Sequence, residues 1–193
     1  DVLVPPGDTE KVENAVGSLF HVQVFGALRV TCATQKLVVT SRVYSKIAGQ
    51  DDTDSMGQDF AGVPESFAIG LGERTQILGA HQTVPSADSE LRFNFGFVET
   101  TGKTVNVRIT AYNELGALQD SKEFQVREWS QRQVAFKDAF PTLSTENSRL
   151  DVEVISGGGK VIAYGSAITN GSQDPTTFEM GFDDALLGAG QSR

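Results

Sequence analysis

The sequence contains few of the side chains from which disulfides and zinc sites are made. Among its 193 residues it has one cysteine, Cys32, and two histidines, His21 and His81. A single cysteine cannot form an intramolecular disulfide, and these three residues lack the spacing of zinc ligands. Because Cys32 lies in an alternating apolar segment, we expect it to be a small buried side chain. Disulfide-stabilised domains and zinc proteins are therefore the first classes that the sequence disfavours.

Positive charge is also scarce. Lys and Arg number 16 against 25 Asp and Glu, which gives a formal net charge of -9. Phosphate binding needs clustered Lys and Arg, so the sequence predicts no nucleic-acid partner and no attraction to an anionic membrane surface. No segment approaches the roughly 18 consecutive apolar residues of a membrane span. The hydrophobic fraction, 39%, is nevertheless sufficient for a folded core.

Motifs of catalysis are missing as well. The sequence has no G-x-S-x-G nucleophile elbow, and Gly165-Ser166-Ala167 falls inside a predicted strand. The glycine-rich turns at residues 70–72 and 157–159 lack the following helix that turns a glycine loop into a phosphate site. We therefore predict that the chain is not an enzyme and has no catalytic residues.

What the sequence does contain is alternation. Short segments rich in Val, Ile, Thr, Phe and Tyr alternate apolar and polar residues and end at Gly, Asn, Asp, Ser or Pro, which is typical of β-strands. The predicted strands are 2–4, 27–32, 37–44, 91–98, 105–112, 123–126, 132–136, 150–155 and 161–168. Helical signal is limited to residues 10–19 and 137–143. Many short strands with regular turns predict an all-β protein, an antiparallel β-sandwich of Ig-like or jelly-roll type.

The strand pattern repeats along the chain at a spacing of 122 residues. The matching pairs are Val2 and Phe124, Val4 and Val126, Val12 and Val134, Asn14 and Phe136, Leu28 and Leu150, Val30 and Val152, and Cys32 and Val154. Two extra residues in the turn at 157–159 change the spacing to 124, after which residues 37–44 match residues 161–168. Any two alternating segments can be aligned by chance. Here, however, the order strand, polar segment, strand, turn, strand is also kept.

The repeat predicts one complete sandwich unit and one partial unit. Residues 1–60 correspond to the back half of a unit, residues 61–182 to a complete unit, and residues 183–193 to a flexible tail. A half unit without front strands leaves sheet edges and an apolar face uncovered. Three sources could cover them: a preceding segment, the second unit, or another copy of the chain by strand addition. The sequence does not choose among the three.

Several turn and core motifs resemble a known kind of module. They are Pro5-Pro6-Gly7, Val12-Glu13-Asn14, Gly26-Ala27-Leu28-Arg29-Val30, Phe93-Asn94-Phe95-Gly96-Phe97-Val98, Ala111-Tyr112-Asn113 and Val161-Ile162-Ala163-Tyr164. Over nearly all of residues 1–182 the chain resembles the tandem β-sandwich (Ig-like) modules of unknown function found in large secreted bacterial proteins. The resemblance implies an Ig-like sandwich on an extracellular polypeptide and supplies no catalytic residues. The chain departs from the pattern at residues 51–54 and 156–159.

One acidic loop is a calcium candidate. Its carboxylates are Asp51, Asp52, Asp54 and Asp59. Closely spaced carboxylates are the hard oxygen ligands that calcium prefers. In an EF-hand alignment, however, Met56 and Val63 occupy positions five and twelve, so that match fails and a solvated loop is the alternative reading. No other cofactor is predicted.

Trp129 marks a candidate binding surface. It is the only tryptophan, and Arg127 and Arg132 lie near it in a polar segment. An exposed indole in a loop can stack on a sugar ring or on a partner surface. These three residues form the candidate ligand- or partner-binding site, and packing against a neighbouring unit is the alternative.

Together these features predict a non-catalytic structural or interaction module on the cell surface or outside the cell. Its expected partners are other copies or neighbouring units of the same polypeptide, which would assemble by strand or edge complementation into an array or fibre. The alternative is a β-sandwich that binds a carbohydrate or another cell-surface ligand.

Overall fold

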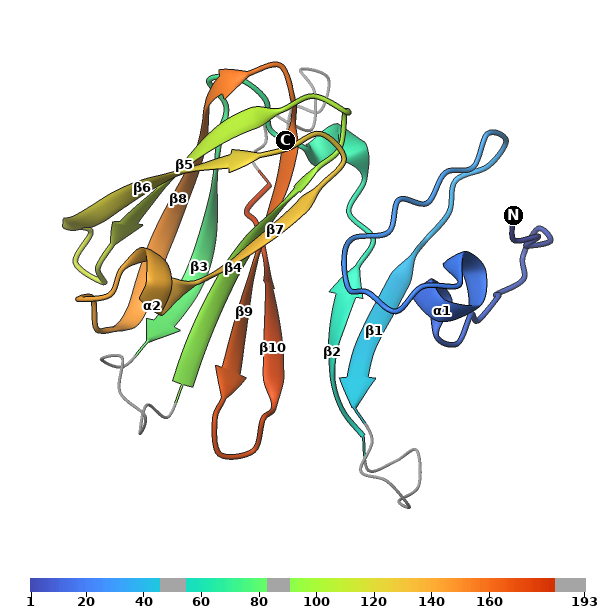
Figure 1. The fold of residues 1–193 in the computed structure, drawn as a ribbon, viewed down its shortest axis with the longest axis horizontal. Coiled ribbons are helices and arrows are strands. Elements are labelled where there is room, and N and C mark those ends of the chain that lie inside the picture. Colours follow the sequence, from blue (N-terminus) through green and yellow to red (C-terminus); the bar gives the residue numbers. More distant parts are fainter. Residues whose placement is uncertain (46–54, 83–90, 183–193) are drawn as a thin grey trace, which may run out of the picture.

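The computed structural model describes residues 1–45, 55–82 and 91–182. The candidate calcium ligands Asp51, Asp52 and Asp54 and the predicted tail at 183–193 lie outside these ranges. Two four-stranded antiparallel sheets pack face to face, and a two-stranded hairpin lies beside them (Figure 1). The predicted all-β sandwich is therefore confirmed.

The first sheet, the β4 sheet, has the strand order β10-β9-β4-β7. Its strands are β4 (Leu91–Glu99), β7 (Gln131–Ala135), β9 (Val161–Thr169) and β10 (Pro175–Glu179). The second, the β5 sheet, has the order β3-β8-β5-β6. It contains β3 (Arg74–Gln82), β5 (Val105–Tyr112), β6 (Leu118–Val126) and β8 (Thr145–Gly157). The short helix α2 (Phe136–Ala139) follows β7, and the 3-10 helix η2 (Glu65–Phe67) precedes β3.

The core forms where the inward residues of the two sheets meet. Phe93, Phe95 and Phe97 are fully buried on one face of β4, as their alternation predicts. Val107 and Ile109 of β5 are equally buried in the opposite layer. The rings of Phe95 and Phe97 meet edge-on at a centroid separation of 5.9 Å, a favoured arrangement for aromatic pairs.

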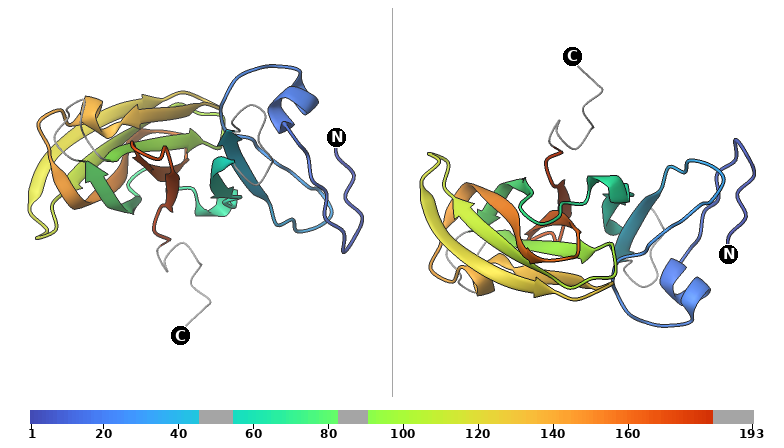
Figure 2. Two further views of the ribbon diagram at one scale, coloured as in Figure 1. Left: turned by 90° about the horizontal axis from the view of Figure 1, so that it is seen from below. Right: turned by 90° about the horizontal axis from the view of Figure 1, so that it is seen from above.

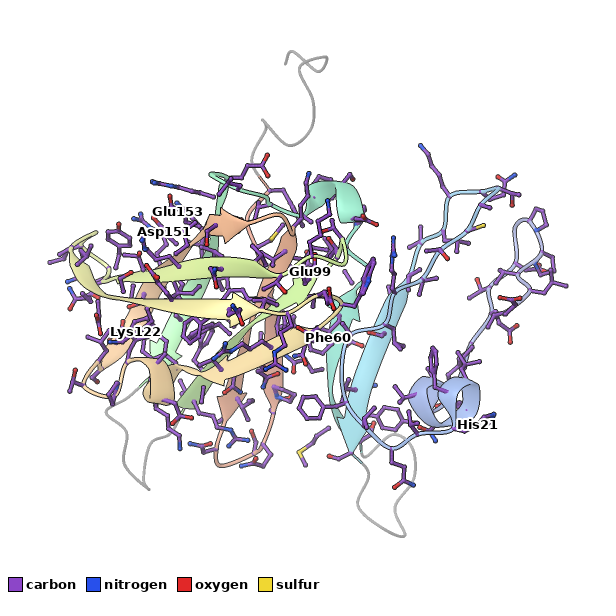
Figure 3. The ribbon with its side chains drawn as sticks, turned by 45° about the horizontal axis from the view of Figure 1, so that its top comes forward. His21, Phe60, Glu99, Lys122, Asp151 and Glu153 are labelled. Atoms are coloured by element: carbon purple, nitrogen blue, oxygen red, sulfur yellow. The ribbon has the colours of Figure 1, made fainter. Side chains whose placement is uncertain are left out.

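The outer face of the β5 sheet carries a row of alternating charges. Arg74 of β3 pairs with Glu153 of β8 at 2.9 Å, and Arg108 of β5 lies 3.6 Å from Glu153 and 2.8 Å from Glu123 of β6. Cross-strand pairs of opposite charge suit a solvated sheet surface. Glu153 and its neighbour Asp151 lie on the side of the sandwich far from the hairpin (Figure 3).

In the described residues of the N-terminal segment (1–45 and 55–63), the structure has one helix and one hairpin. Helix α1 (Ala15–Phe20) is separated by an irregular stretch from β1 (Thr40–Ser45), which pairs with β2 (Met56–Ala61). Seen from below and from above, this segment lies at one side of the sandwich (Figure 2).

The predicted strands of the complete unit are confirmed, and some of those in the first segment are wrong. Residues 2–4 and 27–32 form no strand, and the strand predicted at 37–44 begins only at Thr40. Cys32, predicted to be buried, is exposed. The physical reason is that no second layer covers this side of the segment in the described chain, so its apolar phase has nothing to pack against.

Candidate functional site

Three of the four carboxylates of the predicted calcium site lie outside the described residues. Asp59 is the one candidate ligand within the described residues, and it lies exposed in β2 with its backbone carbonyl accepting a hydrogen bond from the Thr177 hydroxyl at 2.6 Å. Among the residues described, no group of three or more His, Cys, Asp or Glu side chains could hold a metal ion. The same part of the chain contains no helix long and apolar enough to cross a membrane.

Trp129 is held rigidly in the turn between β6 and β7. Its φ of 51° is in the left-handed region, which a bulky residue adopts only when its surroundings enforce it. Its backbone N–H donates to Glu99 Oε2 at 2.9 Å. The indole lies on Gly102, where a Cβ atom would come within 2.6 Å of the ring. The ring is still 57% exposed, so the turn presents it to its surroundings.

Glu99 ties three loops together. The side chain is 3% exposed and accepts hydrogen bonds from the Thr101 hydroxyl at 2.6 Å and from the N–H groups of Thr101, Gly102 and Trp129 at 2.8–2.9 Å. A weaker bond comes from the Lys160 N–H at 3.4 Å. Burial raises the pKa of Glu99, but these hydrogen bonds to the ionised form outweigh it and lower the pKa to about 2. The carboxylate is therefore a structural anchor for the Trp129 turn.

Arg29 of the N-terminal segment contacts the Trp129 ring. The guanidinium carbon lies 4.7 Å from the centroid of the indole, within cation–π range. Arg29 also donates to Glu65 of η2 at 3.0 Å. Sequence reasoning missed Arg29, since it lies 100 positions before Trp129 and only the folded chain brings the two together.

The other two predicted partner-binding residues are not part of this cluster of Arg29, Glu65 and Trp129. The Arg132 guanidinium lies 5.0 Å from the Phe124 ring and donates to the Gln125 carbonyl at 2.8 Å. Arg127 contributes its backbone carbonyl to Ser130. The glycan-stacking interpretation of Trp129 stays a prediction.

A second contact joins the hairpin to the outer face of the β4 sheet. Phe60 of β2 meets the Tyr164 ring of β9 edge-on, with centroids 6.1 Å apart and planes at 87°. Next to it, Gln58 donates to the Ser166 hydroxyl at 2.9 Å. Phe60 of β2 and Glu99 of β4 both lie near the junction between the hairpin and the sandwich (Figure 3).

Tyr164 is arranged to receive this contact. Its ring covers Gly96 of β4, where any Cβ atom would collide with it. Its hydroxyl accepts a hydrogen bond from Gln131 and donates to Gln133 Oε1 at 3.2 Å, both on β7. Burial raises the pKa of Tyr164, and the hydrogen bond from Gln131 only partly offsets this. The phenol stays neutral and spans three strands as a flat, uncharged platform.

In both hairpins, β1–β2 and β9–β10, the first strand pairs with a phenylalanine of the second strand. Ser41 pairs with Phe60 in the first hairpin, and Gly165 pairs with Phe178 in the second. Ser41 and Gly165 are 124 positions apart, so Phe60 and Phe178 occupy equivalent places. In addition, α1 lies 122 positions before residues that overlap α2. These features are compatible with the repeat that the sequence predicts.

Several apolar residues of the first segment are exposed, although the residues to which the predicted repeat matches them are buried. Leu28 and Val30 are 46% and 54% exposed, whereas Leu150 and Val152, their counterparts in β8, are fully buried. Other large hydrophobic side chains are also exposed in this segment: Leu3, Phe20, Val24, Phe25, Val38 and Val43. Apolar side chains that the sequence predicts to face a sandwich core are thus presented to solvent.

Comparison with known proteins adds no functional assignment. No model of a known protein family matches the sequence, and no curated protein matches it. Among solved structures, the chain is similar to the crystal structure of Thermotoga maritima 1070, with a TM-score of 0.47 and 11% identity. The similarity covers 60% of this chain and 97% of that one.

Proposed function

We propose that this chain is a non-catalytic structural module that assembles by sandwich complementation. In this proposal, the N-terminal segment is the back half of a sandwich unit and receives the front strands from another unit of the same kind. In a solution of this chain alone, a second copy is the available source of such strands. The proposed setting is an array or fibre on the cell surface or outside the cell.

The observation that carries the proposal is the exposure of core-phase residues. Leu28, Val30 and Cys32 occupy the places of three β8 residues that are fully buried, yet all three are exposed. Exposed apolar residues are unremarkable singly, but a row of them in the phase of a sandwich core is typical of a surface that another protein layer covers. Strand or sheet addition provides such a layer.

The proposed partner is a β-sheet and not a small ligand, for a geometric reason. The counterparts of these residues in β8 pack against the opposite sheet, which includes the fully buried Phe95 and Phe97. A layer with large side chains in the same alternating phase would bury Leu28 and Val30 in the same way. Burial of apolar surface supplies the driving force, at about 25 cal/mol per Å².

Oligomeric state tests the proposal directly. Light scattering after size exclusion, over a hundredfold range of concentration, should show growth from the 20.7 kDa monomer to larger species. Val30→Asp places a charge in the apolar phase and should abolish that growth. Thr31→Asp, its neighbour in the opposite phase, is the matched control and should assemble like the unchanged chain. A monomer at every concentration would rule out complementation between copies.

Location is tested separately. Fractionation of the native host with an antibody against the sandwich should recover the protein outside the cytoplasm, in the medium or on the cell surface. Recovery in the cytoplasm alone would reject the extracellular part of the proposal while leaving the assembly test unaffected.

A further inference from the structure

The turn that carries Trp129 is built more firmly than an exposed surface loop requires. Its indole rests on Gly102, its backbone is held in the left-handed region, and its N–H is bound by the buried Glu99 carboxylate. Rigid presentation of an aromatic ring lowers the entropy lost when a partner binds to it. The ring is therefore preorganised as a receptor.

The guanidinium of Arg29, which contacts this ring, is well suited to specific recognition. A guanidinium can lie over an aromatic face and donate to a carboxylate at the same time, because it is planar and its donors point outward in its own plane. Arg29 does both, toward Trp129 and toward Glu65. Trp129 and Glu65 thus form a two-part site for one arginine side chain.

The repeat places Arg29 on the outside of its own unit. It lies between Leu28 and Val30, which have the core phase, and its counterpart 122 positions later is Asp151 on the outer face of β8. A completed first unit would bury Leu28 and Val30 and still present Arg29 outward. The contact with Trp129 is therefore compatible with the assembled form as well as with the form described.

We propose that Trp129 and Glu65 form an arginine receptor at the junction between successive sandwich units, and that Arg29 of the preceding unit occupies it. The receptor sets the orientation of one unit relative to the next. This inference rests on the proposed function only in treating the N-terminal segment as part of a unit. It assigns to the single tryptophan a junction role in place of a glycan-binding one.

The chain carries its own distance reporter for this junction. Trp129 is the only tryptophan and Cys32, exposed and close to Arg29 in sequence, is the only cysteine. An energy-transfer acceptor attached to Cys32 reports the distance between the N-terminal segment and the sandwich without any substitution. Time-resolved transfer from Trp129, recorded at a concentration where light scattering shows a monomer, gives the distribution of that distance.

Three variants test the receptor. Arg29→Ala should broaden the distance distribution and raise acrylamide quenching of Trp129 by up to about twofold, because it removes the guanidinium that lies over the ring. Glu65→Gln should produce a smaller broadening, since the stacking contact remains. Arg132→Ala is the matched control: it removes an equal charge that lies on Phe124 instead, and should leave both signals unchanged.

The outcomes separate this inference from the proposed function. An Arg29→Ala chain with the unchanged distribution and quenching would overturn the receptor, whatever the oligomeric state. A chain that never assembles, but whose distribution broadens with Arg29→Ala and not with Arg132→Ala, would support the receptor and reject complementation between copies.

Discussion

Residues 28–44 and 150–168 have the same apolar pattern and opposite environments. Leu150 and Val152 are fully buried in β8, while Leu28 and Val30 are about half exposed and form no strand. The difference does not lie in the pattern. It lies in the second layer. In the later segment, β8 belongs to the β5 sheet and packs against the β4 sheet, whereas residues 28–32 have no equivalent sheet over them among the described residues. Alternation of apolar and polar residues shows which face of a segment can be buried. Burial itself requires a second layer of protein against that face.

The largest expected effect comes from placing a charge at equivalent positions of the two segments. Val152→Asp buries an unpaired carboxylate in the core and should cost roughly 4 kcal/mol or more of unfolding free energy. Val30→Asp should leave the urea midpoint of the sandwich within experimental error and remove only assembly. Equal losses of stability from the two substitutions would show that residue 30 is already buried in the monomer.

A second difference between the regions is the Glu99 anchor, which makes the sandwich sensitive to acid. The pKa of Glu99 is about 2, below its ordinary value of 4.5. A depressed pKa contributes stability that is complete above pH 4.5 and is lost as the pH falls toward 2. The contribution is about 3 kcal/mol at neutral pH, because a tenfold change in proton affinity corresponds to about 1.36 kcal/mol.

Urea unfolding between pH 2 and 7 measures this dependence, with Glu99→Gln as the test and Glu128→Gln as the control in the same turn. Glu99→Gln should lower the stability at pH 7 and flatten its decline toward pH 2. Glu128 is exposed, so its substitution should change neither. A Glu99→Gln chain with the original pH dependence would show that other carboxylates cause the acid sensitivity.

The elements that the sequence predicted are those in which alternation is uninterrupted. The strand at 105–112 has the predicted bounds because Val105, Val107, Ile109 and Ala111 share one buried face. Strand β3 was missed because Gly79, at φ 77°, shifts its register, so Ile77 and Ala80 are both buried three residues apart. Strand β10 was missed because it begins with Pro175 and has only five residues.

The candidate site was less predictable than the fold. Trp129 lies in a polar segment of the sequence, and the structure places it, exposed, in the turn between β6 and β7. Its partner Arg29 could not be found in the same way, since a contact between residues 100 positions apart depends on how the two regions dock. The burial of Cys32 was predicted wrongly for the related reason that alternation alone does not show whether a second layer is present.

The alkylation rate of a cysteine measures how well each of the two segments is buried. Cys32 is exposed, and hydrogen bonds from the backbone of Thr34 and Gln35 to the sulfur lower the pKa of the thiol. The thiol of a monomer should therefore be alkylated quickly. Val154→Cys in a Cys32→Ser background places the thiol at the equivalent buried position. It should react at least about a hundredfold more slowly, because it must wait for unfolding.

Assembly should reduce the difference between the two alkylation rates by slowing the reaction of Cys32 alone. If a second layer covers Cys32, its alkylation should slow at concentrations where oligomers form, while the thiol introduced by Val154→Cys keeps the same rate. Alkylation of Cys32 that is equally fast in monomer and oligomer would contradict burial of this face in the assembly.

The smallest expected effects come from removing one phenylalanine ring from each of the hairpins β1–β2 and β9–β10. Phe178 packs on Phe93 at a ring separation of 5.8 Å. Phe178→Ala should therefore lower the unfolding free energy of the sandwich by about 2 kcal/mol, which is less than for a fully buried ring. Phe60 contacts the outer face of the β4 sheet through the Tyr164 ring, and aromatic pairs of this kind contribute about 1 kcal/mol. Phe60→Ala should therefore speed amide hydrogen exchange in β2 about fivefold, at about 1.4 kcal/mol per tenfold, and leave exchange in β9 unchanged. Faster exchange in both strands would instead show that the β1–β2 hairpin unfolds together with the sandwich, as β9–β10 does.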